Sequence, residues 1–195
     1  MKRTAKIERK TTETKIKATL NLDGSGRQQV ETGIGFFDHM LTLLCVHGLF
    51  DLNLSATGDI EVDYHHTVED VGLVLGEAVN KCLGDRKGIT RYGHAVIPMD
   101  DSLATVTVDL SNRPYLVLRL PDDMPRQNGF DASLAKEFLR AVAQRGGMNL
   151  HITVAYGDNW HHMIEAVFKG FGRALRNAIA LDERVTDVPS SKGKL

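Results

Sequence analysis

The chain has 195 residues, of which 42% are apolar and 25% charged, and its formal net charge is −1. This composition is typical of a globular protein and gives no reason to expect nucleic acid or an anionic membrane surface as a partner, so an anionic ligand would have to meet a local basic cluster. No apolar run approaches the ~20 residues of a membrane span, and the charged N-terminus lacks the apolar region of a signal peptide. We therefore expect a cytoplasmic protein in which Cys45 and Cys82 are buried thiols rather than a disulfide.

The first half of the chain predicts three strands, a helix, a fourth strand and a second helix. Cleanly alternating apolar residues favour a strand over 13–22, and Gly48 stands where a glycine commonly ends a helix. In chain order, the predicted elements are strands 2–10, 13–22 and 28–31, helix 36–48, strand 50–57 and helix 66–83.

The second half predicts the same order of elements. Its strands are 92–98, 104–110 and 115–120, and they are followed by helix 132–145, strand 149–156 and helix 160–181. We therefore predict an α+β fold with two β-β-β-α-β-α half-repeats, 1–88 and 89–183, and a C-terminal tail over 184–195. Two such units would pack as one compact body around a pseudo-twofold axis.

One short motif occurs twice, as His-His-Thr-Val-Glu at 65–69 and as His-His-Met-Ile-Glu at 161–165. On a helix, residues three and four apart share a face, so each Glu lies near both of its His side chains. Imidazole and carboxylate are ligands that borderline divalent metals choose. Adjacent His residues diverge by about 100° around a helix, so the two motifs predict two ions, each completed by another element or subunit. A solvated helix face is the ordinary alternative for a single copy, and the duplication favours metal binding.

The shorter helix of each half supplies a further candidate ligand. Aligning the C-terminal ends of the two short helices places His39 and Glu137 in equivalent positions. His151 is the alternative to Glu137, but it alternates with apolar strand residues and so points away from the core. The predicted metal ligands are His39, His65, His66, Glu69, Glu137, His161, His162 and Glu165.

The two long helices are apolar around most of their circumference. A helix that is apolar on most sides is buried on more than one side. In a chain of this length, the pattern indicates burial against other subunits.

Four longer motifs occur in order along the chain, at 32–41 (Thr-Gly-Ile-Gly-Phe-Phe-Asp-His-Met-Leu), 63–70 (Asp-Tyr-His-His-Thr-Val-Glu-Asp), 157–169 and 189–193 (Pro-Ser-Ser-Lys-Gly). Together they resemble the imidazoleglycerol-phosphate dehydratase family of histidine biosynthesis over essentially the whole chain. The resemblance implies a duplicated α+β unit of the ribosomal protein S5 domain 2-like type, two Mn²⁺ ions per active site, and sites at the subunit interfaces of a 24-subunit homo-oligomeric shell. Many family members have His where this chain has Glu137 and others have Glu, which can ligate Mn²⁺ through oxygen.

The resemblance further implies a lyase that removes water from imidazole glycerol phosphate to give imidazole acetol phosphate. Two metal ions would hold the imidazole or imidazolate ring of this small phosphorylated substrate. Glu13 matches the family's acid or base, although its own sequence context indicates only an exposed glutamate at a strand edge. Asp100 and Asp101 are a turn pair that could also hydrogen-bond near the site.

Positions that match the family's substrate phosphate site are Arg91, Arg113, Ser190, Ser191 and Lys192, and Lys169 could add positive charge. Taken alone, the arginines and the tail residues are more typical of solvated turn arginines and a frayed terminus, and Lys169 could equally extend to solvent.

Two other functions use the same residues. A dinuclear metallohydrolase would use the same ligands to activate water. A non-catalytic shell that stores metal would give no function to Glu13, Arg91, Arg113 or Lys192.

Overall fold

The computed structural model describes residues 3–121, 130 and 132–195. Its first half consists of β1 (Thr4–Lys10), β2 (Thr14–Asn21), β3 (Gln28–Glu31), α1 (Gly35–Gly48), β4 (Asp51–Gly58) and α2 (His65–Leu83). Its second half consists of β5 (Tyr92–Met99), β6 (Ser102–Asp109), β7 (Tyr115–Arg119), α3 (Ala132–Gly146), β8 (Asn149–Tyr156) and α4 (Trp160–Ile179). The predicted β-β-β-α-β-α order is therefore confirmed in both halves.

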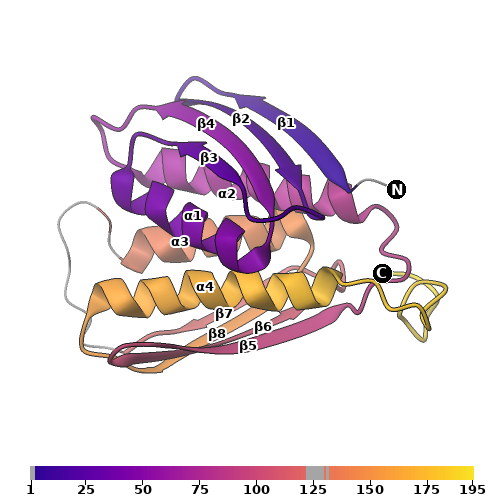
Figure 1. Cartoon of the computed structure of the whole chain (residues 1–195). Coiled ribbons are helices and arrows are strands. Elements are labelled where there is room, and N and C mark those ends of the chain that lie inside the picture. Colours follow the sequence, from indigo (N-terminus) through magenta and orange to yellow (C-terminus); the bar gives the residue numbers. More distant parts are fainter. Residues whose placement is uncertain (1–2, 122–129, 131) are drawn as a thin grey trace.

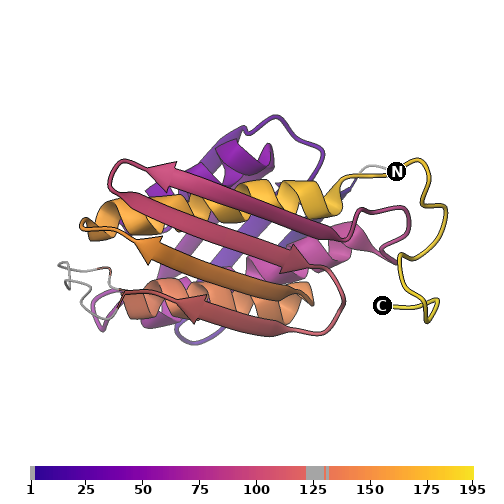
Figure 2. The ribbon, with the colours of Figure 1, turned by 90° about the horizontal axis from the view of Figure 1, so that it is seen from below.

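Each half forms one four-stranded sheet, and the two sheets have the same topology. The strand orders are β1-β2-β4-β3 and β5-β6-β8-β7. In each sheet the first three strands in that order are antiparallel, and the outer pair, β3 with β4 or β7 with β8, is parallel. Figure 1 shows the four helices between the two sheets, and Figure 2 shows the second sheet from its outer face.

Most predicted boundaries agree with the structure to within one or two residues. Residue 2 of the predicted strand 2–10 lies outside the described residues. The last helix ends at Ile179 rather than at 181, because Ala180 has extended backbone angles. The proposed limits of the half-repeats at 88 and 183 remain predictions.

The helices of the two halves pack against each other in equivalent pairs, α2 on α3 and α1 on α4. Glycines permit this close approach: a Cβ at Gly172 would lie 2.5 Å from the backbone oxygen of Leu44, and one at Gly76 would lie 2.7 Å from that of Val142. Leu44 and Val142 occupy equivalent positions when the helix ends are aligned. The pseudo-twofold relation therefore extends to the two helix crossings.

The apolar circumference of the long helices is explained within one chain. On one side α2 packs on β1 and β2, and α4 packs on β5 and β6, while the opposite sides meet α3 and α1. The interpretation that this pattern indicates burial against other subunits is therefore wrong. Within the described part of the chain, no helix is both long and apolar enough to cross a membrane.

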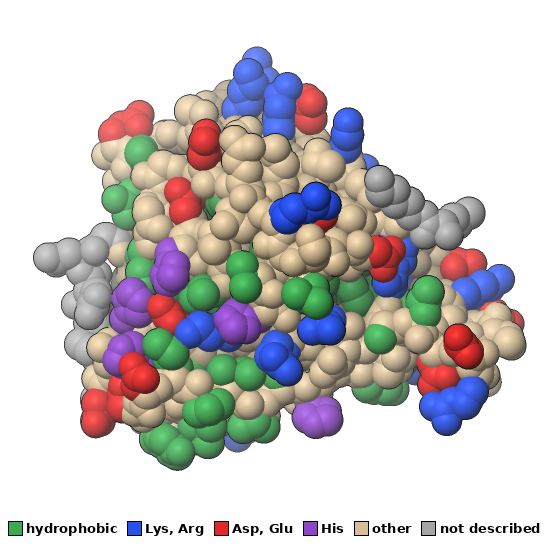
Figure 3. Space-filling view, in the orientation of Figure 1, with side chains coloured by type: hydrophobic (Ala, Val, Ile, Leu, Met, Phe, Trp, Pro, Cys, Tyr) green, Lys and Arg blue, Asp and Glu red, His purple; other side chains and the backbone are tan. Residues whose placement is uncertain are grey.

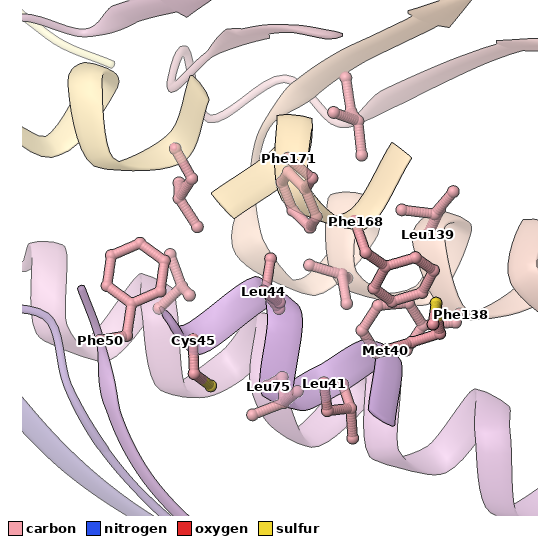
Figure 4. Packing of buried hydrophobic residues seen from close by; sticks show 14 of the residues in the cluster. Met40, Leu41, Leu44, Cys45, Phe50, Leu75, Phe138, Leu139, Phe168 and Phe171 are labelled. Atoms are coloured by element: carbon pink, nitrogen blue, oxygen red, sulfur yellow. The ribbon is translucent and has the colours of Figure 1, made fainter. Parts of the chain in front are cut away.

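The centre of the core lies where the four helices meet. Figure 4 shows Met40 and Leu44 of α1 facing aromatic side chains of α3 and α4. Phe138 of α3 stacks on Phe168 of α4 with ring centroids 5.4 Å apart. Cys45 lies in this core as a free thiol, and burial raises its pKa to about 12. Cys82 is also buried and free, which confirms the prediction of two buried thiols.

Candidate active site

A cluster of two histidines and a glutamate forms where α1 crosses α4. His39 Nε2 lies 2.9 Å, and His161 Nε2 lies 3.0 Å, from the same carboxylate oxygen, Oε1 of Glu165. His161 and Glu165 meet because they are four residues apart on α4, and the helix crossing adds His39 from α1. The three ligand atoms lie within 4.8 Å of one another, so they could hold one divalent ion. In Figure 3 several His side chains gather with acidic groups at this end of the molecule.

Glu165 is the most buried member of the cluster, with 9% of its side chain exposed. Burial pushes its pKa up, but hydrogen bonds from Lys169, His39 and His161 outweigh this effect and bring the pKa to about 2. Lys169 Nζ donates to the second carboxylate oxygen, Oε2, at 2.6 Å. Glu165 is therefore ionised at neutral pH, with Oε1 facing both imidazoles. The structure thus places Lys169 beside the predicted metal ligands and not with the predicted phosphate-binding residues.

The equivalent crossing of α2 and α3 is more open. His65 Nε2 and Glu69 Oε2 are 3.5 Å apart, and their side chains are 44% and 41% exposed. Glu137 pairs with Arg140 on its own helix instead of joining His65 and Glu69. Among the described residues, only the α1–α4 cluster brings three ligand atoms together.

The second histidine of each motif points away from these crossings and binds a loop carboxylate. His66 Nδ1 lies 3.0 Å from Asp59 Oδ2, and His162 Nδ1 lies 2.5 Å from Asp101 Oδ1. These hydrogen bonds raise the pKa of both imidazoles, and among the described residues neither ring makes a hydrogen bond through its Nε2. Asp101 Oδ2 also accepts from the backbone N–H groups of residues 158–159. Metal-bound histidines commonly have such carboxylate partners, and this arrangement would suit either ring as a ligand.

Asp59 was not identified from the sequence, and Asp101 was considered only as half of a turn pair. Both lie in loops at the sheet edge where the histidine motifs begin, and this common position is the signal that could have identified them. His162 Nε2 also lies 3.6 Å from Asp100 Oδ2. Hydrogen bonding near the site by Asp101, considered from the sequence, is therefore present.

Glu13 lies in the turn between β1 and β2, with its Oε2 3.9 Å from His66 Nδ1 and half of its side chain exposed. In the second half, the turn between β5 and β6 places Asp101 beside His162. The two turns are equivalent because Thr14 and Ser102 begin the following strands. In each half, therefore, one carboxylate of this turn, Glu13 or Asp101, lies beside the second histidine of the motif.

The residues matched to a phosphate site also come together. They line a cavity of about 470 Å³ whose walls include Arg91, Arg113, Ser190, Ser191 and Lys192. Arg91 anchors the tail by donating from one guanidinium nitrogen to the Pro189 carbonyl at 2.8 Å. Its Nε lies 2.7 Å from Asp109, so the charge of Arg91 is already balanced within the chain.

This cavity and the histidines lie at opposite ends of β5. Arg91 and Tyr92 stand at the start of the strand, and Asp101, which contacts His162, follows its end. Eight residues at ~3.3 Å each separate the two ends by about 26 Å. One chain therefore does not bring its own phosphate-binding candidates next to its own metal-binding candidates. His151 is exposed on β8, as its alternation predicted, and joins no ligand cluster among the residues that the structure describes.

This chain is similar to known proteins over nearly its full length. Residues 32–175 match the family model described as imidazoleglycerol-phosphate dehydratase. Proteins of that name from Desulfosudis oleivorans and Syntrophobacter fumaroxidans are 57% and 55% identical, covering 99% and 100% of this chain and 99% and 98% of their own.

Two solved structures are also similar. The imidazoleglycerol-phosphate dehydratase from Staphylococcus aureus has a TM-score of 0.82 and 37% identity, over 92% of this chain and 99% of its own. The structure from Pyrococcus furiosus, in complex with (S)-C348, has a TM-score of 0.85 and 38% identity, over 97% of this chain and 100% of its own.

Proposed function

Because the chain belongs to the imidazoleglycerol-phosphate dehydratase family of enzymes, we propose that it removes water from imidazole glycerol phosphate to give imidazole acetol phosphate in histidine biosynthesis. The observation that carries this proposal is the cluster of His39, His161 and Glu165, since an imidazole-binding metal site is what the reaction needs. We further propose that the enzyme works in the cytoplasm.

The first proposed metal site is held by the α1–α4 cluster. Two imidazole nitrogens and one ionised carboxylate oxygen converge there, and this donor set suits a divalent transition metal such as Mn²⁺. The hydrogen bond from Lys169 to the other oxygen of Glu165 leaves the converging oxygen available.

The second proposed site is the pseudo-twofold counterpart at the α2–α3 crossing. There His65 and Glu69 correspond to His161 and Glu165, and Glu137 corresponds to His39. Glu137 would exchange Arg140 for the ion. A carboxylate in place of an imidazole makes this donor set harder, which favours Mn²⁺ over softer metals.

A neighbouring subunit would complete each site. His66 and His162 point away from the crossings, and neither makes a hydrogen bond through Nε2 within the described part of the chain, so each could ligate an ion held by another chain. The ~26 Å between the phosphate cavity and the histidines of one chain supports the same conclusion, because the substrate is shorter than this distance. We propose active sites at subunit interfaces and, from the family resemblance, a shell of 24 subunits.

In this assembly each group of the chain has a separate task. When bound, the two metal ions supply Lewis-acid stabilisation of negative charge on the imidazole ring of the substrate. Glu13, beside His66 and open to solvent, would take the proton from the poorly acidic substrate carbon. Arg113 and Lys192 would bind the phosphate, with the serine hydroxyls of the tail as further donors. Arg91, whose charge is balanced by Asp109, would mainly hold the tail in place.

The direct test is conversion of imidazole glycerol phosphate by the purified protein, with added Mn²⁺ and with chelator. We expect metal-dependent formation of imidazole acetol phosphate, and elemental analysis should find about two ions per chain. A Glu13→Gln variant should retain its metal and lose turnover. Release of inorganic phosphate would instead indicate a metallohydrolase, and bound metal without any turnover would indicate a storage shell.

A further inference from the structure

One buried acid has no place in the proposed metal sites. Among the described residues, the buried charged side chains are Asp70, Arg86 and Glu165. Glu165 belongs to the histidine cluster, and Arg86 donates to backbone carbonyls near the end of α3. Asp70, on the first buried turn of α2, is 7% exposed and directly follows the His-His-x-x-Glu motif.

Asp70 binds both strands that flank the turn carrying Glu13. Its Oδ2 accepts a hydrogen bond from Thr14 Oγ1 at 2.5 Å, and its Oδ1 lies 2.9 Å from Nε of Arg9. Arg9 belongs to β1, and Thr14, itself 4% exposed, begins β2. The carboxylate therefore joins helix α2 to both sides of one hairpin.

The hydrogen bonds of this turn are all donated in one direction, from the Glu13 N–H through Thr11 and Thr14 to Asp70. Because Thr14 donates its hydroxyl proton to Asp70, the 3.2 Å contact between Thr14 and Thr11 must use the proton of Thr11. The oxygen of Thr11 then accepts from the backbone N–H groups of Glu13, at 3.1 Å, and Thr14, at 2.9 Å. Each of the two hydroxyl protons therefore has one acceptor, and the Thr11 oxygen that they orient holds the backbone N–H of Glu13.

The equivalent hairpin in the second half lacks this arrangement. Ala166 takes the place of Asp70 in the repeat, and Ser102, which corresponds to Thr14, donates to Asp101 within its own turn. The same topology therefore forms without a buried carboxylate beneath the turn. A purely structural need for Asp70 would apply to both halves, whereas the arrangement occurs in the half with Glu13.

We propose that Asp70 is a positioning residue: through Thr14 and Thr11 it fixes the turn that presents Glu13 beside His66. This inference rests on the proposed function, in which Glu13 transfers the proton. A displacement of about 1 Å in a reacting group can cost about 100-fold in rate, so a relaxed turn would lower kcat without removing the metal ligands.

The test compares Thr14→Val, which keeps the shape but removes the hydroxyl, with Thr14→Ser, which keeps the hydroxyl. We expect Thr14→Val and Asp70→Asn to lower kcat about 10- to 100-fold, with KM and metal content unchanged. Thr14→Ser should keep most of the wild-type kcat. If a buried substitution prevents folding, Thr11→Ala tests the same connection at the half-buried residue that holds the Glu13 N–H.

A matched control is available in the same half. Asp51 also fixes a turn through its carboxylate, which accepts from the backbone N–H groups of Ser25 and Arg27 at 2.8 and 3.0 Å. That turn carries no proposed catalytic group, so Asp51→Asn should lower stability and leave kcat of the folded enzyme unchanged.

Glu13→Gln separates this inference from the proposed function. Full activity of Glu13→Gln would remove the proposed role of Glu13. An inactive Glu13→Gln together with wild-type kcat in Thr14→Val, Asp70→Asn and Thr11→Ala would overturn the positioning role of Asp70 and leave the proposed function intact.

Discussion

The two helix crossings are formed by equivalent helices with glycines at equivalent positions, and they differ in the contacts that their polar side chains make. At the α1–α4 crossing, Glu165 is 9% exposed and contacts two histidines. At the α2–α3 crossing, Glu69 is 41% exposed, and Glu137 pairs with Arg140. A repeated fold therefore does not guarantee a repeated site, because the state of each site depends on the residues around its ligands.

One pair of equivalent positions explains much of this difference. Lys169 of α4 donates to Glu165, whereas its counterpart in α2 is the apolar Leu73. The ammonium group holds Glu165 ionised and in one orientation. Leu73 offers no such hydrogen bond to Glu69, so we expect the proposed α2–α3 site to become ordered only when an ion binds.

The largest expected effect concerns metal binding at the two crossings. Loss of an outer partner commonly costs 10- to 100-fold in metal affinity, so loss of a ligand should cost more than about 100-fold. We expect Glu165→Gln to lose the tighter of the two proposed ions, and Glu69→Gln to lose the weaker one. Elemental analysis during titration with a chelator would measure both affinities. Equal affinities at the two crossings would contradict the difference in organisation.

A smaller effect is expected for the glycines that permit the crossings. An added Cβ would lie 2.5 Å from a backbone oxygen at Gly172 and 2.7 Å from one at Gly76. Overpacking of this kind costs about 1–3 kcal/mol, which exceeds the gain of up to about 1 kcal/mol from alanine in a helix. Urea unfolding should show Gly172→Ala as the less stable variant of the two. Gly35→Ala is the control, because nothing lies within 4 Å of its added Cβ, and destabilisation as large as in the other two would contradict the explanation.

The smallest effect concerns the ends of the two short helices, which carry His47 in α1 and Arg145 in α3. Desolvation lowers the pKa of His47 below 6.5, and the charges of Lys169 and Arg173 add to this shift. The unfolded chain then binds the proton more readily, so His47 should reduce stability as the pH falls below about 6.5.

His47→Gln should weaken this pH dependence, and Arg145→Gln should not, because an arginine stays charged at both pH values. Unfolding free energies at pH 7.5 and 5.5 would measure the difference between each variant and the wild type. The same slope for His47→Gln and the wild type would contradict the assigned cause.

The sequence predicted the features that depend on local spacing and on the repeat. The offset of 96 residues between the histidine motifs indicated two related halves, and the four-residue spacing of His161 and Glu165 indicated their contact. Aligning the helix ends also placed Leu44 and Val142 in equivalent positions. In the structure the backbone of each residue lies against the glycine of a helix crossing.

Features that depend on loop paths and strand directions were not predictable in this way. Asp59 and Asp101 reach the histidines only because the sheet edges bring distant loops together. The separation of Arg91 from His162 follows from the direction of β5. The pairing of Glu137 with Arg140 had a local signal, because the two residues are three apart on one helix. That spacing alone does not show whether Glu137 pairs with Arg140 or joins His65 and Glu69.

The helices of each half pack mainly against helices of the other half, and this has a consequence for a chain that is cut between the halves. In each half the sheet covers one side of its helices, while the faces marked by Gly76 and Gly172 are covered by the other half. A half produced as a separate polypeptide would expose that apolar face, and a second copy of the same half could cover it. The two halves therefore pack like the subunits of a dimer that a short linker joins. If the chain is cut between α2 and β5, the two fragments should remain associated.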